Sequence, residues 1–463
     1  MQASDKCVQE FLQTVCKQIR FKGIHKDIVG ELSGHIEDQK NQYIKQGLDE
    51  AAAAVKAVEQ MGDPVLIGKQ LDKAHRPKTE WSILSLALLL VIIGGGVQFL
   101  LSGVSAYSSD AFSRFLLYAP VGIASFICVY FFDYTLLGRY SKLVYFLLIG
   151  VTIGGFMFLS RQCGAYRHVY YSALLFIPAF AGIIYGFRNK GYVGIIASGM
   201  FYAGAALLCL LGSSFSGFFL LTVSCLIVLT VAIKKGFFGG SKKVGFAIVY
   251  IPVAAVLLFI IVSNPSLLGE RFSIMGYMYL TVRRLVDSSQ PWGEAVMDGK
   301  FAGMGIDQFL PGWSTDFSLT YIIARLGYVP GLAIVAVLLI LIVRIFISVI
   351  KQKNAYGFLV AFSACLAITG QTVFYVLSNL GIIAPFAGIL PFISFGRIGF
   401  VVNMILVGLL LSVYRRTDLV KDRLGNKVYN RRVFTVADGK LIIDLGMIVS
   451  GNTKKEKDEL IQK

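Results

Sequence analysis

Apolar residues fill ten long stretches of this chain, and shorter polar or basic segments separate them. A transmembrane helix needs about 20 mostly apolar residues, so each stretch predicts one membrane span. The predicted spans cover residues 81–102, 115–132, 143–159, 170–187, 192–211, 218–233, 244–262, 319–350, 356–377 and 398–414. The eighth is too long for one straight crossing, and Gly327, Pro330 and Gly331 predict its break into a short entry helix and the span proper. The pattern predicts an all-α polytopic membrane protein with about ten transmembrane helices.

Polar segments flank the spans and predict further parts. In residues 1–76, apolar positions recur at helical spacing, which predicts a small module of four helices. Its third helix is expected to begin at a cap formed by Asp49 and to end at Gly62. In the polar tail, residues 417–463, alternating positions around Asp438 and Gly439 predict a β-hairpin.

Residues 263–318 form the one large connection between spans, the seventh and the eighth. Loops longer than about 15 residues are usually functional or disordered. Aromatic and apolar residues occur throughout this one, so we expect it to fold against the helix bundle.

Composition and charge support a membrane protein and set its orientation. Of 463 residues, 56% are hydrophobic and only 15% are charged, whereas a soluble domain is about 25% charged. The formal net charge is +17, and most Lys and Arg residues gather at one set of span ends and in the tails. The positive-inside rule then predicts that both termini are cytoplasmic and that the large connection is external. Charge spread along membrane edges argues against nucleic acid as a partner.

Leader and cysteine patterns add two expectations. The first 75 residues contain no apolar core of a secretory signal peptide, so the first span is expected to direct insertion. The seven cysteines show no zinc-site spacing, and only Cys163 is expected outside, which predicts neither a metal site nor an external disulfide framework.

The stretch NLGIIAPFAGILPFISFGRIGFVVN, residues 379–403, is the strongest candidate for a working site. It carries two prolines, four glycines, a serine and an arginine between two apolar segments. Irregular backbone is not tolerated against lipid, because each unpaired amide or carbonyl group costs several kcal/mol there. We expect this stretch to be buried in protein or to line a wet cavity near a membrane face.

Three other segments carry candidate chemistry. Asp316 lies where the large connection enters the eighth span, and a carboxylate at that boundary is a functional candidate by default. The alternative is a helix cap, because Ser314, Thr315 or Asp316 could each cap a helix that begins near Phe317. Glycines in residues 299–306 could form a tight turn near a pyrophosphate. Arg167 could grip phosphate through its planar fork of donors, or simply reach to the membrane interface.

These segments resemble the SEDS family, the FtsW, RodA and SpoVE proteins of shape, elongation, division and sporulation. The most specific match is to the family's L-P-F-x-S-Y-G-G motif, and it comprises Leu390, Pro391, Phe392, Ser394 and Gly396. Asn379 with Gly381 and Pro385 with Gly388 match its N-x-G and P-x-x-G pieces, Thr315–Phe317 resembles H-T-D-F, and 164–167 resembles G-A-x-R. Single matches are Gln371, Asn403 and, early in the large connection, Arg271. The resemblance covers residues 80–416.

Residues 1–76 resemble a different module, the permease prefix that is found ahead of some Gram-positive membrane proteins. The matching segments are ELSGHIED and AVEQMGDP. This resemblance implies attachment or regulation rather than catalysis, and a Gram-positive cytoplasmic membrane as the location.

The SEDS resemblance implies glycosyl transfer that polymerises lipid II into peptidoglycan strands at the outer membrane face. Asp316 would be the general base on the acceptor hydroxyl. Cationic groups or a divalent cation would stabilise the leaving pyrophosphate. The implied substrate-binding residues are Arg167, Arg271, Lys300, Gln371, Asn379, Pro391, Ser394, Gly396 and Arg397. The implied partners are lipid II, membrane lipids and a class B penicillin-binding protein, a transpeptidase.

Several positions depart from the family pattern. Two glutamates before the leucine-glycine of the eighth span are Ala324 and Arg325 here, and the residue after Arg167 is His168 instead of tryptophan. Lost carboxylates weaken a metal-assisted mechanism, and Arg325 and Arg397 could supply positive charge instead. Two other functions stay open: a flippase for the lipid-linked precursor, which broken helices would fit, and a non-catalytic scaffold that recruits a transpeptidase.

Overall fold

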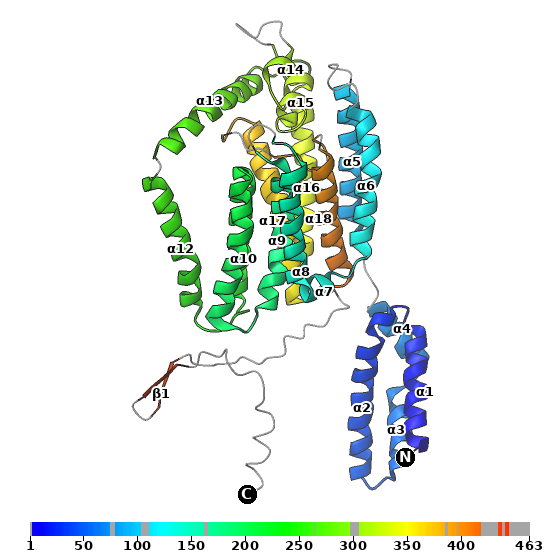
Figure 1. The fold of residues 1–463 in the computed structure, drawn as a ribbon. Helices are drawn as coiled ribbons and strands as arrows, with labels where there is room; N and C mark the ends of the chain where they lie inside the picture. The colour runs from blue at the N-terminus through cyan, green and yellow to red at the C-terminus, as the bar shows by residue number, and fades with distance from the viewer. Residues whose placement is uncertain are drawn as a thin grey trace. The chain divides into compact units, whose positions relative to one another are not determined.

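The computed structural model describes residues 2–74, 79–102, 111–161, 165–263, 265–296, 305–384, 388–394, 396–417, 434–437 and 440–443. The chain forms two compact units, which are described separately. The first comprises residues 1–137 and 277–423, and the second comprises residues 138–276 and 424–463. Figure 1 gives the element labels.

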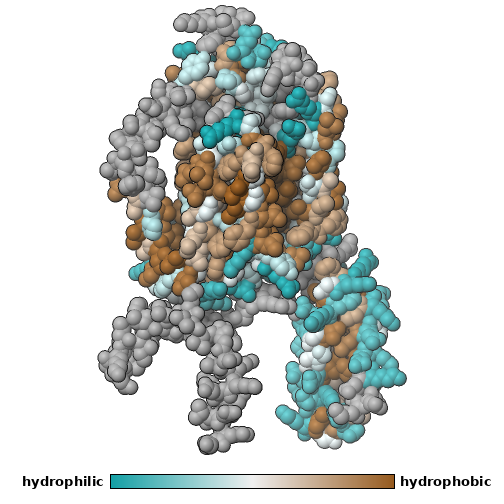
Figure 2. All heavy atoms as spheres, in the orientation of Figure 1, coloured by the Kyte–Doolittle hydropathy of each residue, from teal (hydrophilic) through white to brown (hydrophobic). Residues whose placement is uncertain are grey.

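Ten long helices coincide with the ten predicted spans. They are α5 (Trp81–Ser102), α6 (Ala111–Phe131), α8 (Ser141–Phe158), α9 (Arg167–Gly186), α10 (Gly191–Leu211), α11 (Phe215–Lys234), α12 (Lys242–Ser263), α16 (Tyr328–Ile350), α17 (Ala355–Asn379) and α18 (Arg397–Arg415). Within the described residues, nine of them, all except α12, are long and apolar enough to cross a membrane. Large apolar side chains such as Met157 and Phe158 are exposed, and Figure 2 shows such side chains on the outer helix faces. The prediction of an all-α polytopic membrane protein is confirmed.

The N-terminal segment folds as four helices with one 3₁₀ turn. They are α1 (Gln2–Gln18), η1 (Lys22–Ile24), α2 (His25–Lys45), α3 (Glu50–Met61) and α4 (Pro64–Ala74). Side chains spaced along α1, among them Phe11 and Val15, are buried against Ile28 and Ile36 of α2. Asp49 caps α3 by accepting a hydrogen bond from the amide of Ala51, and the helix ends at Gly62, where φ is +88°. Both predicted helix ends are confirmed.

The eighth predicted span is divided in two at Gly327, as the sequence predicts. Entry helix α15 (Ser318–Leu326) precedes Gly327, where φ is +103°, and α16 follows it. Pro291 explains the need for glycine: a Cβ at position 327 would lie 2.4 Å from the Pro291 carbonyl oxygen. Pro291 is part of segment 290–295. This segment is hydrogen-bonded to the end of α15 through the amides of Gly293 and Ala295.

The large connection contains a helix that the sequence analysis did not identify. Helix α13 (Pro265–Asp287) occupies its first half, and the short helix α14 (Ile306–Phe309) lies near its end. Phe309, Leu310 and Trp313 are buried. The described end of the connection is therefore packed within the first unit, to which it belongs.

Close helix contacts in the first unit depend on small residues and one arginine. At Gly122 of α6 a Cβ would lie 2.4 Å from the Phe400 ring of α18. Arg416, just after α18, donates hydrogen bonds to the carbonyl oxygens of Phe131 and Phe132 at the end of α6, at 3.0 and 2.6 Å. The short helix α7 (Tyr134–Arg139) follows, and the Tyr134 ring stacks on that of Tyr356 in α17.

The second unit is built around α9, and 78% of the apolar stretch of this helix is buried. Helices α8, α10 and α11 pack against it, and α12 packs against α10 and α11. Strands β1 (Phe434–Ala437) and β2 (Lys440–Ile443) pair antiparallel, with Ala437 opposite Lys440. The predicted hairpin is confirmed in its strands, and Asp438, Gly439 and Cys163 lie outside the described residues.

Candidate functional site

A buried cluster of hydroxyl groups joins three segments of the first unit that are far apart in the sequence. The Ser318 hydroxyl, at the start of α15, lies 2.6 Å from the Ser394 hydroxyl and 2.8 Å from the Tyr375 hydroxyl of α17. Tyr375 and Ser318 are fully buried, and Ser394 is 6% exposed. The Tyr375 hydroxyl also donates to the carbonyl oxygen of Thr315. These bonds attach the L-P-F-x-S motif to the segment that carries Asp316.

Asn379, the last residue of α17, holds the same segment by its backbone. Its Nδ2 donates to the carbonyl oxygen of Asp316 at 3.0 Å, and its Oδ1 accepts from the amide of Thr320 at 3.1 Å. The Thr320 hydroxyl adds bonds to both oxygens of Asn379. Because Asn379 is completely buried, all these bonds form away from water, where an unmade bond is costly.

Asp316 lies in a tight turn that begins at Gly312. The carbonyl oxygen of Gly312 accepts from the amides of Thr315 and Phe317, and Gly312 has a φ of +75°, which favours glycine. Beside the turn, the Trp313 ring lies 4.8 Å from that of Tyr321. Asp316 is half-buried. The turn therefore presents the carboxylate at the boundary between buried and exposed residues.

The side-chain hydrogen bonds that the structure shows at the start of α15 come from α17, not from a local cap by Ser314, Thr315 or Asp316, the alternative to a catalytic Asp316. The N-cap residue is Phe317, and it makes no side-chain cap bond. Instead, the amide of Ser318 donates to the Tyr375 hydroxyl and that of Thr320 to Asn379. First-turn amides have no partner inside their own helix, so α17 supplies the cap from outside. Asp316 stays a catalytic candidate rather than the residue that caps this helix.

The loop around Pro391 is tightly folded. The Ser394 hydroxyl accepts from the amide of Leu390, and Phe392 has a left-handed φ of +68°, which is strained for a residue with a bulky side chain. The Phe392 carbonyl oxygen reaches α5 so closely that a Cβ at Gly94 would lie 2.2 Å from it. Gln98 of α5 donates to the carbonyl oxygen of Ile393 at 2.8 Å. Irregular backbone is thus buried in protein, as residues 379–403 predict.

Gln371 and Asn403 form a second buried polar pair between α17 and α18. Gln371 Nε2 donates to Asn403 Oδ1, and Asn403 Nδ2 donates to the carbonyl oxygen of Gly399. Both side chains are completely buried. Within the described residues, Gln371 Oε1 has no hydrogen-bond partner. The pair lies two helical turns along α17 from Asn379.

The positively charged candidates come from different parts of the chain. Arg397, the first residue of α18 after Gly396, is exposed. Arg325 forms an ion pair with Glu294 of the large connection, so its positive charge already has a partner. Arg167 begins α9 in the second unit and is half-buried. The side chain of Arg271 and all of Lys300 lie outside the described residues.

No group of three or more His, Cys, Asp and Glu side chains suited to a metal ion occurs among the described residues. Asp316 is the one acidic residue in the turn that begins at Gly312. The described residues therefore form no metal centre of their own.

Tyr375 is the site residue that the sequence analysis missed. It lies four residues after Gln371 and four before Asn379, which places all three on one face of α17. This polar stripe inside an apolar span was the available signal. Ser318 and Thr320 were missed as well, because their partners are about 60 residues away.

Fold and site together define a polytopic helical membrane protein with a buried polar site where a short entry helix, a span and a strained loop meet. Residues 284–419 match the sequence profile of the Cell cycle protein family that comprises FtsW, RodA and SpoVE. This part of the chain is similar to that family, and the match covers the segment that holds the site.

Individual relatives agree with this family. A probable peptidoglycan glycosyltransferase FtsW of Idiomarina loihiensis is 27% identical over 230 residues, which are 45% of this chain and 52% of that protein. Stage V sporulation protein E of Bacillus subtilis is 27% identical, over 38% of this chain and 54% of that protein. The chain thus spans about half the length of these curated relatives. A chain of a solved peptidoglycan synthase complex shares the fold, with a TM-score of 0.58, 14% identity, and coverage of 73% of this chain and 98% of that one.

Proposed function

We propose that this chain is a peptidoglycan glycosyltransferase that polymerises lipid II at the outer face of the cytoplasmic membrane. The observation that carries the proposal is the 2.6 Å contact between the hydroxyls of Ser318 and Ser394. It joins the L-P-F-x-S motif to the residue that directly follows Thr315–Phe317, and Asn379 holds the backbone of Asp316 beside it. The printed names of the curated relatives support the same reaction.

Asp316 is the proposed general base. Its carboxylate takes the proton from the acceptor's 4-hydroxyl as that oxygen bonds to the anomeric carbon of the donor sugar. The bond from that carbon to undecaprenyl pyrophosphate breaks, and the pyrophosphate leaves with the electron pair. A base must be held within hydrogen-bond reach of the proton that it removes. The bonds from Asn379 and Tyr375 hold the Asp316 turn in place for this step.

The leaving pyrophosphate needs positive charge. Arg397 is exposed next to the L-P-F-x-S motif, so it is the best-placed candidate among the described residues of the first unit. Arg167, Arg271 and Lys300 stay candidates from the family resemblance, and a divalent cation could be held by the substrate's own phosphates. Arg325 is a weaker choice, because Glu294 already pairs with it. In this scheme Gln371, Pro391 and Gly396 shape the site.

The surroundings follow from the same proposal. Both termini are cytoplasmic, with residues 1–76 as an attachment or regulatory module ahead of the membrane domain and 417–463 as a tail. A class B penicillin-binding protein crosslinks the product strands during elongation, division or sporulation. The prefix-like module favours a Gram-positive bacterium.

The test is polymerisation of labelled lipid II by the purified protein with a candidate transpeptidase partner. Wild type is expected to form glycan strands, and Asp316→Asn, which keeps shape but removes the base, is expected to lose at least about a hundredfold in rate. Asp287→Asn is the matched control, because Asp287 is an exposed carboxylate in the same connection. It should retain activity.

Other outcomes identify the alternatives. If wild type makes no polymer while the complex is intact and a family control works, the scaffold is favoured. If wild type instead moves labelled lipid II across vesicle membranes and Asp316→Asn does not impair this movement, the flippase is favoured.

A further inference from the structure

One end of the second unit collects positive charge. Residues 134–269 contain no Asp or Glu at all, but they contain ten Lys and Arg residues. Eight of these lie at one set of helix ends: Arg139, Lys142, Arg188, Lys190, Lys234, Lys235, Lys242 and Lys243. A surface so uniformly basic attracts anions.

The structure joins these charges into one surface. The turn between α9 and α10 is hydrogen-bonded to the turn between α11 and α12: the amides of Asn189 and Gly191 donate to the carbonyl oxygens of Phe237 and Phe238, at 2.8 and 2.9 Å. The ammonium groups of Lys142 and Lys190 each lie 5.1 Å from the centre of the Phe187 ring. Residues from three connections therefore share one basic face.

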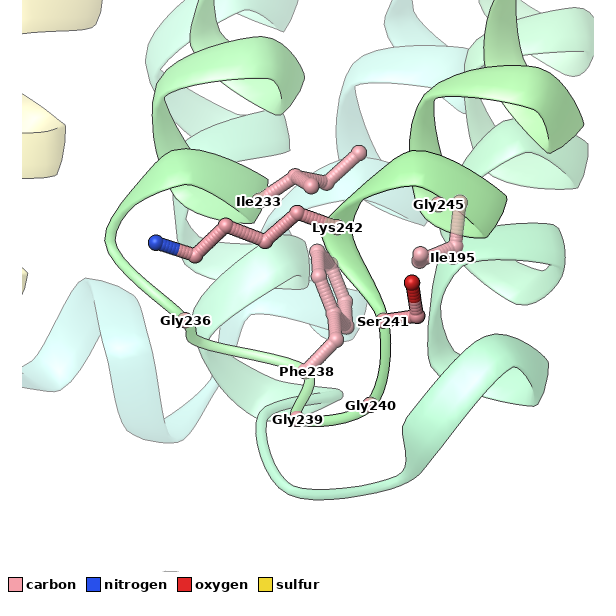
Figure 3. Close-up of a pocket in the computed structure, with 9 residues that line it drawn as sticks. All are labelled: Ile195, Ile233, Gly236, Phe238, Gly239, Gly240, Ser241, Lys242 and Gly245. Atoms are coloured by element: carbon pink, nitrogen blue, oxygen red, sulfur yellow. The ribbon is translucent and has the colours of Figure 1, made fainter. Parts of the chain in front are cut away.

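A small hollow opens in the middle of this face. Its cavity volume is about 10 Å³. It is lined by Ile195, Ile233, Gly236, Phe238, Gly239, Gly240, Ser241, Lys242 and Gly245. Figure 3 shows the Lys242 side chain extending between Ile233 and Phe238, toward the side of Gly236. Three of the glycines have φ between 75° and 77°, a conformation that favours glycine. Because glycine has no side chain, the backbone of this loop is little covered. The hydroxyl of Tyr192 fixes it by accepting a bond from the amide of Ser241.

We propose that this hollow binds the phosphate of an anionic phospholipid headgroup. The residues that contact the phosphate are Ser241 and Lys242, and Lys234, Lys235 and Lys243 surround it with charge. Lipid is the expected source, because α10 begins and α11 ends at this hollow and both are membrane spans. A headgroup reaches that level from the side while its acyl chains stay against the helices. Clusters of four to eight basic residues next to spans are typical of sites for anionic lipids.

The experiment measures lipid retention by the full-length protein in detergent, using native mass spectrometry. Wild type is expected to bind dioleoylphosphatidylglycerol at least about tenfold more tightly than dioleoylphosphatidylcholine. The double substitution Lys242→Gln with Lys243→Gln should remove most of this preference. Ser241→Glu places a negative charge in the hollow and keeps the backbone amide that bonds Tyr192, so it should have the same effect in a folded protein.

A matched control separates this site from general basicity. Lys351→Gln with Lys353→Gln removes two exposed lysines from a helix end of the first unit, and it should leave the preference within about twofold. The proposal is overturned if this control loses as much as the Lys242 and Lys243 variant, or if wild type shows no preference for the anionic lipid. Excess inorganic phosphate should not displace the lipid, and displacement would identify a free-anion site instead.

Discussion

Asn379 Nδ2 donates a 3.0 Å hydrogen bond to the backbone carbonyl oxygen of Asp316, across 63 residues of sequence. The same side chain accepts from the amide of Thr320 in the first turn of α15. One buried amide thus fixes the position of the proposed base and also caps the helix that follows it.

Asn379→Ala should therefore damage activity more than stability. Loss of the bonds to Asp316 and Thr320 is expected to cost about 1–3 kcal/mol of unfolding free energy. Freed from its anchor, Asp316 shifts, and a displacement of about 1 Å can lower a rate about a hundredfold. Polymerisation of lipid II and thermal unfolding are measured on the same preparation.

Asn354→Ala is the control for that experiment. Asn354 caps the opposite end of α17 by accepting from the amides of Tyr356 and Gly357, so its loss should cost about 1 kcal/mol and leave the Asp316 turn intact. Equal loss of activity in both variants would show that stability alone explains the effect.

Tyr375 and Ser394 should be energetically coupled. Their hydroxyl groups lie 3.2 Å apart, and both contact the Ser318 hydroxyl. In a double-mutant cycle with Tyr375→Phe and Ser394→Ala, the interaction energy is expected to be about 0.5–3 kcal/mol. Ser412→Ala replaces Ser394→Ala in the control cycle, because Ser412 bonds to Phe132 instead. Additive effects in the first cycle would contradict the shared network.

Gly94→Ala should disturb the L-P-F-x-S loop from a distance. The added methyl would meet the Phe392 carbonyl oxygen at 2.2 Å, so the loop must move, at an expected cost of about 1–3 kcal/mol and with loss of activity. Gly96 lies two residues after Gly94 in α5. Gly96→Ala should be neutral, because nothing lies within 4 Å of the added methyl. The two melting temperatures are compared in one detergent, and similar values would refute the close contact.

The N-terminal helices offer a pH-dependent contact. The Lys40 ammonium donates a 2.7 Å hydrogen bond to Glu50 Oε1 and lowers the pKa of that carboxyl. Because the folded pKa lies below the unfolded value of about 4.3, the contact stabilises the fold above that pH and is lost as pH falls through the folded pKa. Lys40→Met should raise the pKa of Glu50, as followed by NMR of the labelled carboxyl. Lys56→Met, which removes a cation over the Tyr43 ring, should not.

Local sequence rules predicted much of this fold because its signals are local. Hydrophobic length located the ten spans, and Gly327 marked the break before α16. Helix α13 was missed because charged residues such as Glu270 and Arg283 interrupt its apolar positions, so that its segment reads as a polar connection. Boundaries differ mainly at α6, which begins at Ala111 instead of residue 115.

The sequence singled out some residues of the candidate site but not the bonds between them. The motifs singled out Asn379, Ser394 and Asp316, while a local cap of α15 from residues 314–316 was one of two open interpretations. Its true donors and acceptors are set by how α17 packs beside α15, which no local rule describes. Tyr375 shows the same point: its hydroxyl finds partners from two segments, at Thr315 and at Ser394.

The external cap of α15 has a consequence for how such proteins can diverge. Asn379 and Tyr375 grip the backbone of the Asp316 turn through carbonyl and amide groups that every residue at those positions would offer. The structure of the turn therefore does not depend on the Asp316 carboxylate. A related protein with a neutral side chain at this position would keep the same turn. With Asp316 as the proposed base, active and inactive proteins of this fold would superimpose and would differ in the side chain at position 316.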